Sequence, residues 1–261
     1  MPDRIDINCD MGESFGAYKL GWDQEVMDYI SSANIACGWH AGDPMVMDKT
    51  VRLAKEKGVA VGAHFGYADL MGFGRRRMEL SLNEIENYML YQMGALYAFA
   101  KAHGLPLQHV KAHGALGNLA FVDLEASKAI ARAALRFSKD IILVIYSGTV
   151  MVQAAKEIGV RFVEEVYADR VYNPDGTLQS RKIPGSVIHD SEKAAWQALT
   201  SVQEGYVVAH DGTIRILMRP WGHTQRTRNP SRNTRRTQES LDRGQTHGPV
   251  RGWKRKSADY H

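Results

Sequence analysis

The sequence lacks a long apolar stretch and has few cysteines. No run approaches the roughly 18 to 20 consecutive apolar residues that a membrane helix needs, and the N-terminal segment lacks the apolar core of a secretory signal. The two cysteines, Cys9 and Cys37, belong to no CxxC pair, which excludes a disulfide framework and argues against a cysteine zinc site. These absences predict a cytoplasmic protein that does not associate with membranes.

Charge and apolar residues are unevenly distributed along the 261 residues, whose formal net charge is +4. Residues 219–261 hold eleven of the 33 Lys and Arg and three of the 29 Asp and Glu, an excess of +8 that leaves −4 for residues 1–218. The last segment has six apolar residues, too few to offset the entropy of ordering it. We therefore predict one α/β domain over 1–218, a size that suits a barrel, and a disordered basic tail over 219–261.

The basic tail invites the hypothesis of nucleic-acid binding. Its eleven Lys and Arg would bind phosphates in a salt-dependent way. Its two tryptophans, Trp221 and Trp253, are too sparse to form a platform on which bases stack. We therefore do not expect nucleic-acid binding to be the function of this segment.

Short apolar runs alternate with longer segments of helical period. The runs predict strands over residues 5–9, 33–37, 59–64, 109–113, 141–146 and 162–167. The segments predict helices over 44–57, 82–103, 123–137, 149–158 and 191–204. Pro44 suits a first helical turn, Gly58 a helix end, and Ser81 with Glu84 an S-x-x-E capping box. This order predicts a mostly parallel sheet covered by helices, either a barrel or an open doubly wound sheet.

Chemically active side chains follow strand after strand: Asp10, His40, His64, His113 and Asp169. A βα barrel places its active site at these strand ends, whereas an open sheet gathers ligands mainly at one switch point. The chain also has no GxGxxG or Walker A pattern at a first strand–helix turn, which counts against nucleotide folds with glycine-rich loops. We therefore predict a barrel with a polar site at its C-terminal mouth.

The first two motifs supply carboxylates and a histidine. In NCDMGE, Asp10 could bind a metal or act as a general base, and Glu13 could hold a partner or be the second acid–base group. A helix-capping acid and a solvated glutamate are the alternative. In ACGWHAGDP, His40 lies in a glycine-rich loop and is a functional candidate, whereas Asp43 is better explained as a helix N-cap.

The third motif, GAHFGYADLMGFGRRR, combines a strand-end histidine with an arginine cluster. His64 could bind a metal or transfer a proton beside an anion-binding loop that includes Asp69 and Arg75. An ordinary solvated arginine run explains Arg76 and Arg77 equally well.

Two further motifs follow later strands. In HVKAHGALGN, Lys111 and His113 are two residues apart on a strand and face the same side, where Lys111 could bind an anion and His113 could be an acid, base or ligand. His109 shares this face further from the strand end, and we interpret it as structural. In EVYADR, Asp169 and Arg170 could orient a polar substrate, or form a plain surface ion pair.

These strings resemble the LamB/YcsF lactam-utilisation family over about residues 3–213, through NCDMGESFG, SSANIACGWHAGDP, VGAHFGYADLMGFGRR, HVKAHGAL.N, EVYADR.Y and DGTL. The resemblance implies a TIM-like βα barrel, seven-stranded and related to the glycoside hydrolase/deacetylase group. It also implies ATP-dependent opening of the lactam 5-oxoproline to L-glutamate, together with partner subunits. A metal-dependent deacetylase or hydrolase of the same barrel group, or a non-catalytic homologue, is the alternative.

The resemblance gives the candidate residues their roles. Lactam opening through a phosphorylated amide needs cationic groups and a base for water. The implied cofactor is ATP with Mg²⁺. Four of the catalytic candidates are also suitable ligands for a divalent metal, namely Asp10, His40, His64 and His113. The catalytic candidates are Asp10, His40, His64, Lys111 and His113. The candidates for binding substrate or phosphate are Glu13, Asp43, Asp69, Arg75, Asn118, Asp169 and Arg170.

The chain departs from the family pattern in its loops and at its end. KPHGALYN occurs here as KAHGALGN, and GAHPGYPD as GAHFGYAD, so prolines that would stiffen the mouth loops are lost. After Leu217 the family continues into a last strand and a final helix, whereas this chain becomes polar and arginine-rich, as a shifted reading frame or mis-assigned exon would produce. We expect the barrel to lack that strand and helix, to expose an edge, and to have impaired activity.

Overall fold

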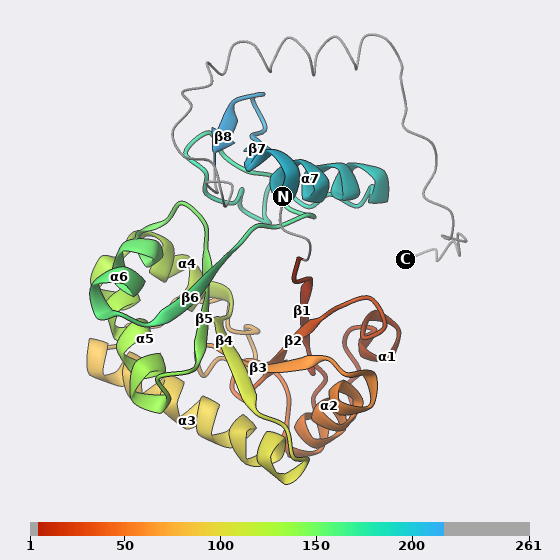
Figure 1. Cartoon of the computed structure of the whole chain (residues 1–261), viewed down its shortest axis with the longest axis vertical. Coiled ribbons are helices and arrows are strands. Elements are labelled where there is room, and N and C mark those ends of the chain that lie inside the picture. Colours follow the sequence, from red (N-terminus) through yellow and green to blue (C-terminus); the bar gives the residue numbers. More distant parts are fainter. Residues whose placement is uncertain (1–4, 217–261) are drawn as a thin grey trace. The chain divides into compact units, whose positions relative to one another are not determined.

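The computed structural model describes residues 5–216. Six parallel strands pair in chain order, and the sheet curls into half a barrel with helices along its outer side (Figure 1). The strands are β1 Asn8–Met11, β2 Ser32–Ala36, β3 Ala60–Phe65, β4 Leu107–Ala112, β5 Ile142–Tyr146 and β6 Arg161–Glu165. This architecture confirms the prediction of an α/β protein with a TIM-like curled parallel sheet.

The five predicted helices are confirmed to within one or two residues. The helices are α1 Asp23–Val26, α2 Pro44–Lys57, α3 Leu82–Ala102, α4 Gly114–Val122, α5 Leu124–Phe137, α6 Val150–Ile158 and α7 Ser191–Glu204. Sequence periodicity missed α1, which is a single turn, and α4, whose apolar residues occupy most positions and so show no 3.6-residue period. No helix among the described residues is both long and apolar enough to cross a membrane.

Side-chain caps determine where the helices begin. The Asp43 carboxylate accepts hydrogen bonds from the backbone N–H groups of Met45 and Val46, which confirms it as the N-cap of α2. Ser81 and Glu84 form the expected reciprocal capping box at the start of α3. These caps fix the point at which the chain leaves each loop, and the loop before α2 carries His40.

The chain after β6 does not extend the parallel sheet within residues 5–216. Strands β7 Tyr206–Val208 and β8 Ile214–Ile216 form a separate antiparallel pair. Strand β6 is therefore one edge of the sheet and β1 is the other. The expected last strand beyond residue 217 and the basic segment 219–261 lie outside the described residues.

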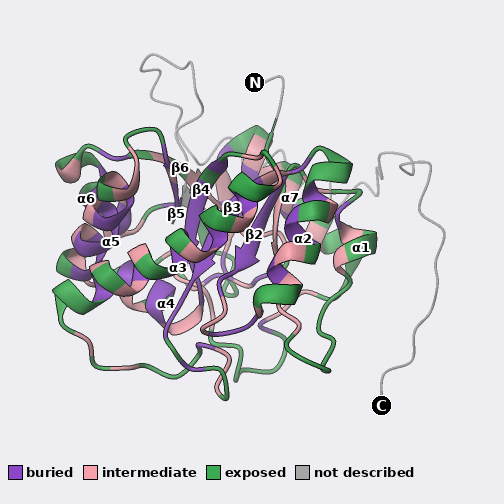
Figure 2. Cartoon of the chain, turned by 90° about the horizontal axis from the view of Figure 1, so that it is seen from below, coloured by how far each residue is buried: buried purple, intermediate pink, exposed green. Residues whose placement is uncertain are grey.

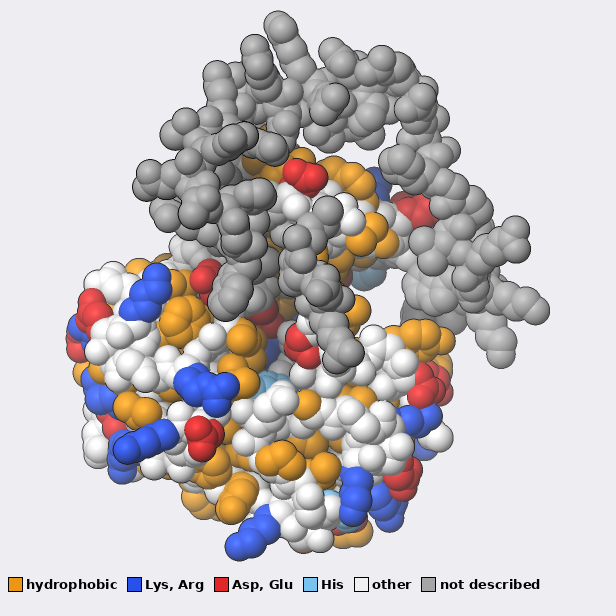
Figure 3. Space-filling view, in the orientation of Figure 1, with side chains coloured by type: hydrophobic (Ala, Val, Ile, Leu, Met, Phe, Trp, Pro, Cys, Tyr) orange, Lys and Arg blue, Asp and Glu red, His pale blue; other side chains and the backbone are white. Residues whose placement is uncertain are grey.

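The two faces of the sheet differ in chemistry. Side chains such as Ile35, Ala63 and Val110 are fully buried in the core between the strands and their helices, whose outer sides are exposed (Figure 2). The opposite face is polar: Asn34 on β2 donates from Nδ2 to Asn8 Oδ1 on β1 at 2.7 Å, and His109 on β4 contacts Asn34 Oδ1 at 2.9 Å. On the face of the molecule drawn in Figure 3, acidic and basic side chains are interspersed among the described residues.

A glycine makes room for His109 on the polar face. Gly62 on β3 pairs in register with His109 on β4, and a Cβ at Gly62 would overlap the imidazole ring of His109. The ring therefore lies directly over the glycine, where it reaches Asn34. The buried contact with Asn34 agrees with the interpretation of His109 as a structural residue.

We predict that Gly62→Ala destabilises the fold, because the added methyl group must displace a buried ring. The free energy of unfolding should fall by about 1–3 kcal/mol, as overpacked cores do. Urea unfolding followed by circular dichroism measures the change. Gly94→Ala is the matched control, since Gly94 is exposed in α3 with open space around it, and there alanine should stabilise by up to about 1 kcal/mol. Gly62→Ala as stable as the wild type would contradict the steric argument.

Candidate active site

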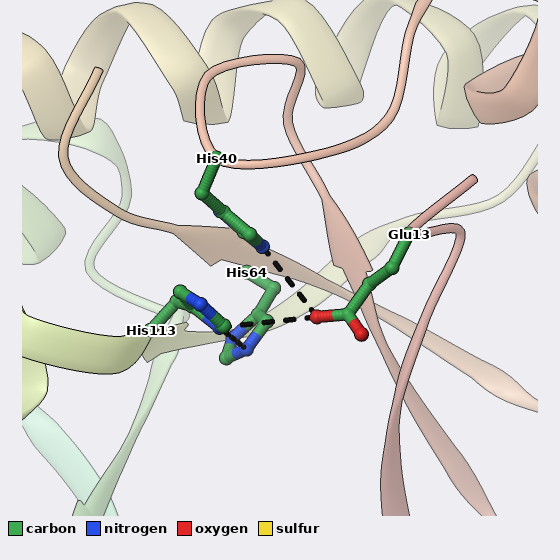
Figure 4. A group of neighbouring side chains, drawn as sticks. All are labelled: Glu13, His40, His64 and His113. Atoms are coloured by element: carbon green, nitrogen blue, oxygen red, sulfur yellow. Dashed lines mark hydrogen bonds and ion pairs between the residues drawn. The ribbon is translucent and has the colours of Figure 1, made fainter. Parts of the chain in front are cut away.

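Four side chains converge at the C-terminal ends of the first four strands (Figure 4). We call Glu13, His40, His64 and His113 the histidine cluster; one potential ligand atom from each lies within 4.8 Å of all the others. His64 Nε2 and His113 Nδ1 are 2.9 Å apart, and the rings of His40 and His113 stack with centroids 3.7 Å apart. Glu13 Oε1 lies 3.6 Å from His40 Nε2 and 3.8 Å from His113 Nδ1.

Short loops hold these rings in place. His113 Nε2 contacts the backbone oxygen of Phe73 at 2.9 Å, so the loop after β3 positions a residue that follows β4. Gly74 adopts a left-handed φ of 62°, and a Cβ there would lie 2.7 Å from the Cβ of His40. The same loop is fixed at its start by Gln92, which both donates to and accepts from the backbone of Gly66.

Burial controls the charge of the cluster. His40 is fully buried, and burial lowers its pKa well below the ordinary value; neighbouring His113 and His64 act in the same direction. Burial likewise lowers the pKa of His113 to about 3, and raises the pKa of the Glu13 carboxyl to about 7. His40 and His113 are therefore neutral imidazoles beside a carboxyl group that titrates near neutral pH.

A lysine lies beside the cluster between two carboxylates. Lys111 Nζ on β4 is 3.4 Å from Asp10 Oδ1 on β1 and 3.0 Å from Glu165 Oε2 on β6, and the lysine side chain is 4% exposed. Burial opposes its charge, but Asp10 and Glu165 outweigh burial and raise its pKa. Burial also opposes ionisation of Asp10, yet the charges of His64 and Lys111 hold the pKa of Asp10 well below its usual value. Lys111 and Asp10 are therefore both charged at neutral pH.

Asp10 connects the lysine to the histidine cluster. Its Oδ2 lies 3.3 Å from His64 Nε2, and its Oδ1 accepts a hydrogen bond from Asn34 Nδ2 at 3.0 Å. The Asp10 side chain is 37% exposed, more than the other members of this network. Asp10 is therefore an ionised carboxylate that stays accessible to a bound water or substrate.

Sequence reasoning missed two members of this network. Glu165 is the last residue of β6, and its position in the EVYADR motif was the available signal. Asn34 is fully buried in the middle of β2, where an amide between apolar neighbours indicates a hydrogen-bonding role. Both assignments needed the strand register, which brings β1, β2, β4 and β6 to a common interior.

Three of the other predicted site residues have structural contacts. Asp43 caps α2 and also accepts from the backbone N–H of Gly16. Asp69 accepts from the backbone N–H of Gly72 and binds the guanidinium of Arg76, which folds the loop between β3 and α3. Arg170 is buried and donates to the backbone oxygen of Gln179, while its Nε has no hydrogen-bond partner.

The remaining three predicted binding residues are exposed. Arg75 lies at the edge of the cluster, with its guanidinium 4.9 Å from the Phe73 ring centroid and close enough to Glu13 to interact electrostatically. Asn118 is exposed on α4, and Asp169 is exposed after β6; within residues 5–216 neither shares a hydrogen bond with the cluster through its side chain. The structure thus brings together six of the twelve predicted residues and places Arg75 at their border.

An aromatic pocket opens next to Glu165. Tyr146 and Tyr167 stack within it at a centroid distance of 5.5 Å, and Lys111 Nζ lies 5.3 Å from the Tyr167 ring centroid. The lining residues are Phe121, Tyr146, Ser147, Thr149, Glu165, Tyr167, Tyr172, Gly176, Thr177 and Leu178. Aromatic rings therefore border the buried ion pair of Lys111 and Glu165.

Comparison with known proteins gives close matches over most of the chain. The LamB/YcsF family model matches residues 5–219. A Pyrococcus horikoshii protein named as a 5-oxoprolinase subunit is 58% identical over 209 residues, which cover 80% of this chain and 82% of the relative. A Campylobacter jejuni protein of the same name is 51% identical over the same shares. The crystal structure of a lactam utilization protein from Thermus thermophilus has a TM-score of 0.79 at 49% identity, covering 83% of this chain and 87% of that one.

We predict strong energetic coupling between Lys111 and Glu165. Lys111→Met leaves buried carboxylates without their cation and should lower the free energy of unfolding by about 3–5 kcal/mol. Adding Glu165→Gln should recover part of this loss. The double variant should therefore lose less unfolding free energy than the two single variants lose together, by more than about 1 kcal/mol. Urea unfolding of the wild type, both single variants and the double variant measures the coupling.

The exposed ion pair between Lys57 and Asp28, 2.6 Å apart, supplies the control cycle. Lys57→Met combined with Asp28→Asn should show a coupling below about 1 kcal/mol, because solvent screens the pair. The prediction is wrong if the buried pair couples no more strongly than this surface pair.

Proposed function

This chain belongs to the LamB/YcsF family, and from that premise we propose that it is a cytoplasmic subunit of a 5-oxoprolinase. The proposed reaction opens the lactam ring of 5-oxoproline to L-glutamate, coupled to ATP hydrolysis, in an assembly with partner subunits. The observation that carries this proposal is 58% identity over 209 residues to a protein named as a 5-oxoprolinase subunit. The family match over residues 5–219 includes every residue of the histidine cluster and of the Asp10, Lys111 and Glu165 network.

The chemistry of ring opening sets what a site must supply. A water adds its oxygen to the ring carbonyl carbon, the carbon–nitrogen bond breaks, and the nitrogen takes up a proton to become the amino group. The site must therefore orient water, stabilise negative charge on the carbonyl oxygen and bind the substrate carboxylate.

The described side chains can divide these tasks. Asp10 is ionised and partly exposed, so it can accept a hydrogen bond from the attacking water and orient it. Lys111 and Asn34 hold Asp10 in position. Arg75 is an exposed cation at the border of the cluster and suits the substrate carboxylate. We propose that the histidine cluster polarises the carbonyl oxygen.

ATP use is part of the proposal for the assembly. Lys111 is already neutralised by two carboxylates, so it offers no free charge to a phosphate. Arg75, at the border of the cluster, is close enough to Arg181 to interact with it electrostatically. Two arginines are few for a triphosphate with its Mg²⁺, so we derive no phosphoryl-transfer step from this chain.

A metal-dependent deacetylase or other hydrolase is the second candidate function. The histidine cluster favours it, since three imidazoles and a carboxylate suit a hydrolytic metal centre. Turnover of an acetylated sugar without ATP or partner subunits would support this alternative. The names of the relatives favour lactam opening.

We also propose that the activity of this chain is impaired relative to its family. The parallel sheet ends at β6 among the described residues, and β7 and β8 pair with each other instead of extending it. The family match ends at residue 219. A barrel closed by further elements would hold Glu165 and the aromatic pocket more firmly than an open edge does.

We predict that His64→Ala lowers glutamate release from 5-oxoproline by on the order of 10²–10⁴, because His64 lies between Asp10 and the rest of the cluster. The assay contains ATP and the cognate partner subunits. His103→Ala is the matched control, since His103 binds Asp48 outside the site, and it should keep the wild-type rate. Equal rates for His64→Ala and the wild type would remove the cluster from the mechanism.

The same assay tests the impairment. A chain in which residues 218–261 are replaced by a family-type C-terminus should release glutamate faster than the present chain. Equal rates would show that the divergent segment has no effect on activity.

A further inference from the structure

Two histidines of the cluster face each other through ring nitrogens that would both carry lone pairs if both rings were neutral. A backbone carbonyl only accepts hydrogen bonds, so His64 Nδ1 must donate to Lys111 O, 3.1 Å away, and His113 Nε2 must donate to Phe73 O, 2.9 Å away. The remaining nitrogens, His64 Nε2 and His113 Nδ1, are 2.9 Å apart. Two lone pairs at this distance repel unless a proton or a cation lies between or beside them.

A proton on His64 would satisfy only part of the cluster. It would bond to His113 Nδ1 or to Asp10 Oδ2. The buried atoms Glu13 Oε1, His40 Nδ1 and His40 Nε2 would still have no hydrogen-bond partner. Buried polar atoms without partners are rare in proteins, so Glu13 Oε1 and His40 Nε2, which lie 3.6 Å apart, call for a further group between them.

We propose that Glu13, His40, His64 and His113 bind one divalent transition-metal ion. The cation accounts for the opposed ring nitrogens and for the unpartnered Glu13 oxygen and His40 Nε2 together. Three imidazoles and one carboxylate form a donor set that suits zinc. Tetrahedral zinc with metal–nitrogen bonds of about 2.0–2.1 Å separates its ligand atoms by about 3.4 Å, and the distances of 2.9, 3.6 and 3.8 Å in the cluster lie around this value.

The outer hydrogen bonds of the rings fit the same interpretation. Histidine ligands commonly donate their second ring N–H to a backbone carbonyl, which fixes the tautomer and aims the other nitrogen at the metal. His64 and His113 make this bond to Lys111 O and Phe73 O. His40 stacks on His113 with the ring planes 5° from parallel, so one of these two rings must turn for both to direct a nitrogen lone pair at the ion.

The structure favours Glu13 over Asp10 as the carboxylate ligand. Asp10 already accepts from Asn34 and pairs with Lys111, and these partners turn its Oδ1 toward the interior of the sheet. Glu13 Oε1 has no partner and points at the three histidines (Figure 4). Asp10 then lies beside the metal site through its contact with His64 and does not complete it.

The location of the site indicates what a bound ion would do. A cation there would act as a Lewis acid that polarises a carbonyl oxygen, next to the water-orienting carboxylate of Asp10. Only this step rests on the function proposed above. Metal binding itself is tested without substrate, ATP or partner subunits, so its failure is separate from a failure of the proposed activity.

The test is a titration of the metal-free full chain with Co²⁺, which substitutes for zinc and gives an intense visible band in a tetrahedral site. One equivalent should produce the band, and one equivalent of Zn²⁺ should remove it. Zn²⁺ should also raise the melting temperature, since it binds the folded state. Absence of the band together with an unchanged melting temperature would overturn the proposal.

Variants locate the site within the chain. Glu13→Gln and His113→Ala should each weaken Co²⁺ binding more than about 100-fold, because even partners outside the ligand set contribute about 10–100-fold. Asp10→Asn should weaken it less than Glu13→Gln does. His103→Ala, a histidine paired with Asp48 away from the cluster, should bind as the wild type does.

The variants also separate the cluster from other histidines of the chain. Circular dichroism spectra and melting curves of the metal-free variants confirm that each has folded. Unchanged Co²⁺ affinity in folded Glu13→Gln and His113→Ala would place the ion elsewhere and overturn the proposal. Stronger weakening by Asp10→Asn than by Glu13→Gln would overturn the assignment of Glu13 as the carboxylate ligand.

Discussion

The charge of Lys111 is the constraint around which the interior of this half-barrel is arranged. A buried ammonium group is costly unless anionic partners surround it, and Lys111 on β4 has Asp10 on β1 and Glu165 on β6. Strands β1 and β6 are the two edges of the sheet and share no backbone pairing. Lys111 therefore connects the two edges of the sheet through side-chain contacts. A hydrogen bond of 3.4 Å from Asn8 Nδ2 to Glu165 Oε2 adds a second side-chain connection between them.

The same constraint separates two kinds of chemistry at the strand ends. Asp10 uses one oxygen for Lys111 and Asn34 and directs the other toward His64. Beyond His64, burial keeps His40 and His113 neutral. The charged network of Lys111 and Asp10 therefore meets the histidine cluster at the contact between Asp10 and His64. Metal binding is favoured on the neutral side, because neutral imidazole nitrogens have lone pairs to offer a cation.

The sequence was informative where a property is local or follows from strand order. The N-cap at Asp43 and the capping box of Ser81 and Glu84 depend on residues a few positions apart, so their prediction was straightforward. The convergence of the histidines followed from the rule that the ends of parallel strands meet at one edge of a sheet. The part played by Glu165 depends on which strand faces which across the curl, and the sequence carries no direct record of that pairing. Adjacent arginines of one loop have different contacts, which the sequence does not distinguish: Arg76 binds Asp69, whereas Arg75 lies over the Phe73 ring.

The loops around the cluster show how a site keeps its geometry when stiffening residues are absent. Phe65 at the end of β3 and Ala68 in the loop after it stand where the family resemblance predicts prolines, and a proline restricts a loop by removing backbone freedom from the unfolded chain. Here the restraint comes from bonds formed in the folded state: Gln92 holds both backbone groups of Gly66, and Asp69 closes the loop through three hydrogen-bonding groups of Gly72 and Arg76. A proline would restrict the loop whether or not α3 is folded. The hydrogen bonds from Gln92 on α3 restrict it only while α3 is packed against the loop. The position of Phe73 O, and through it the orientation of His113, therefore depends on the packing of a helix that carries no residue of the cluster.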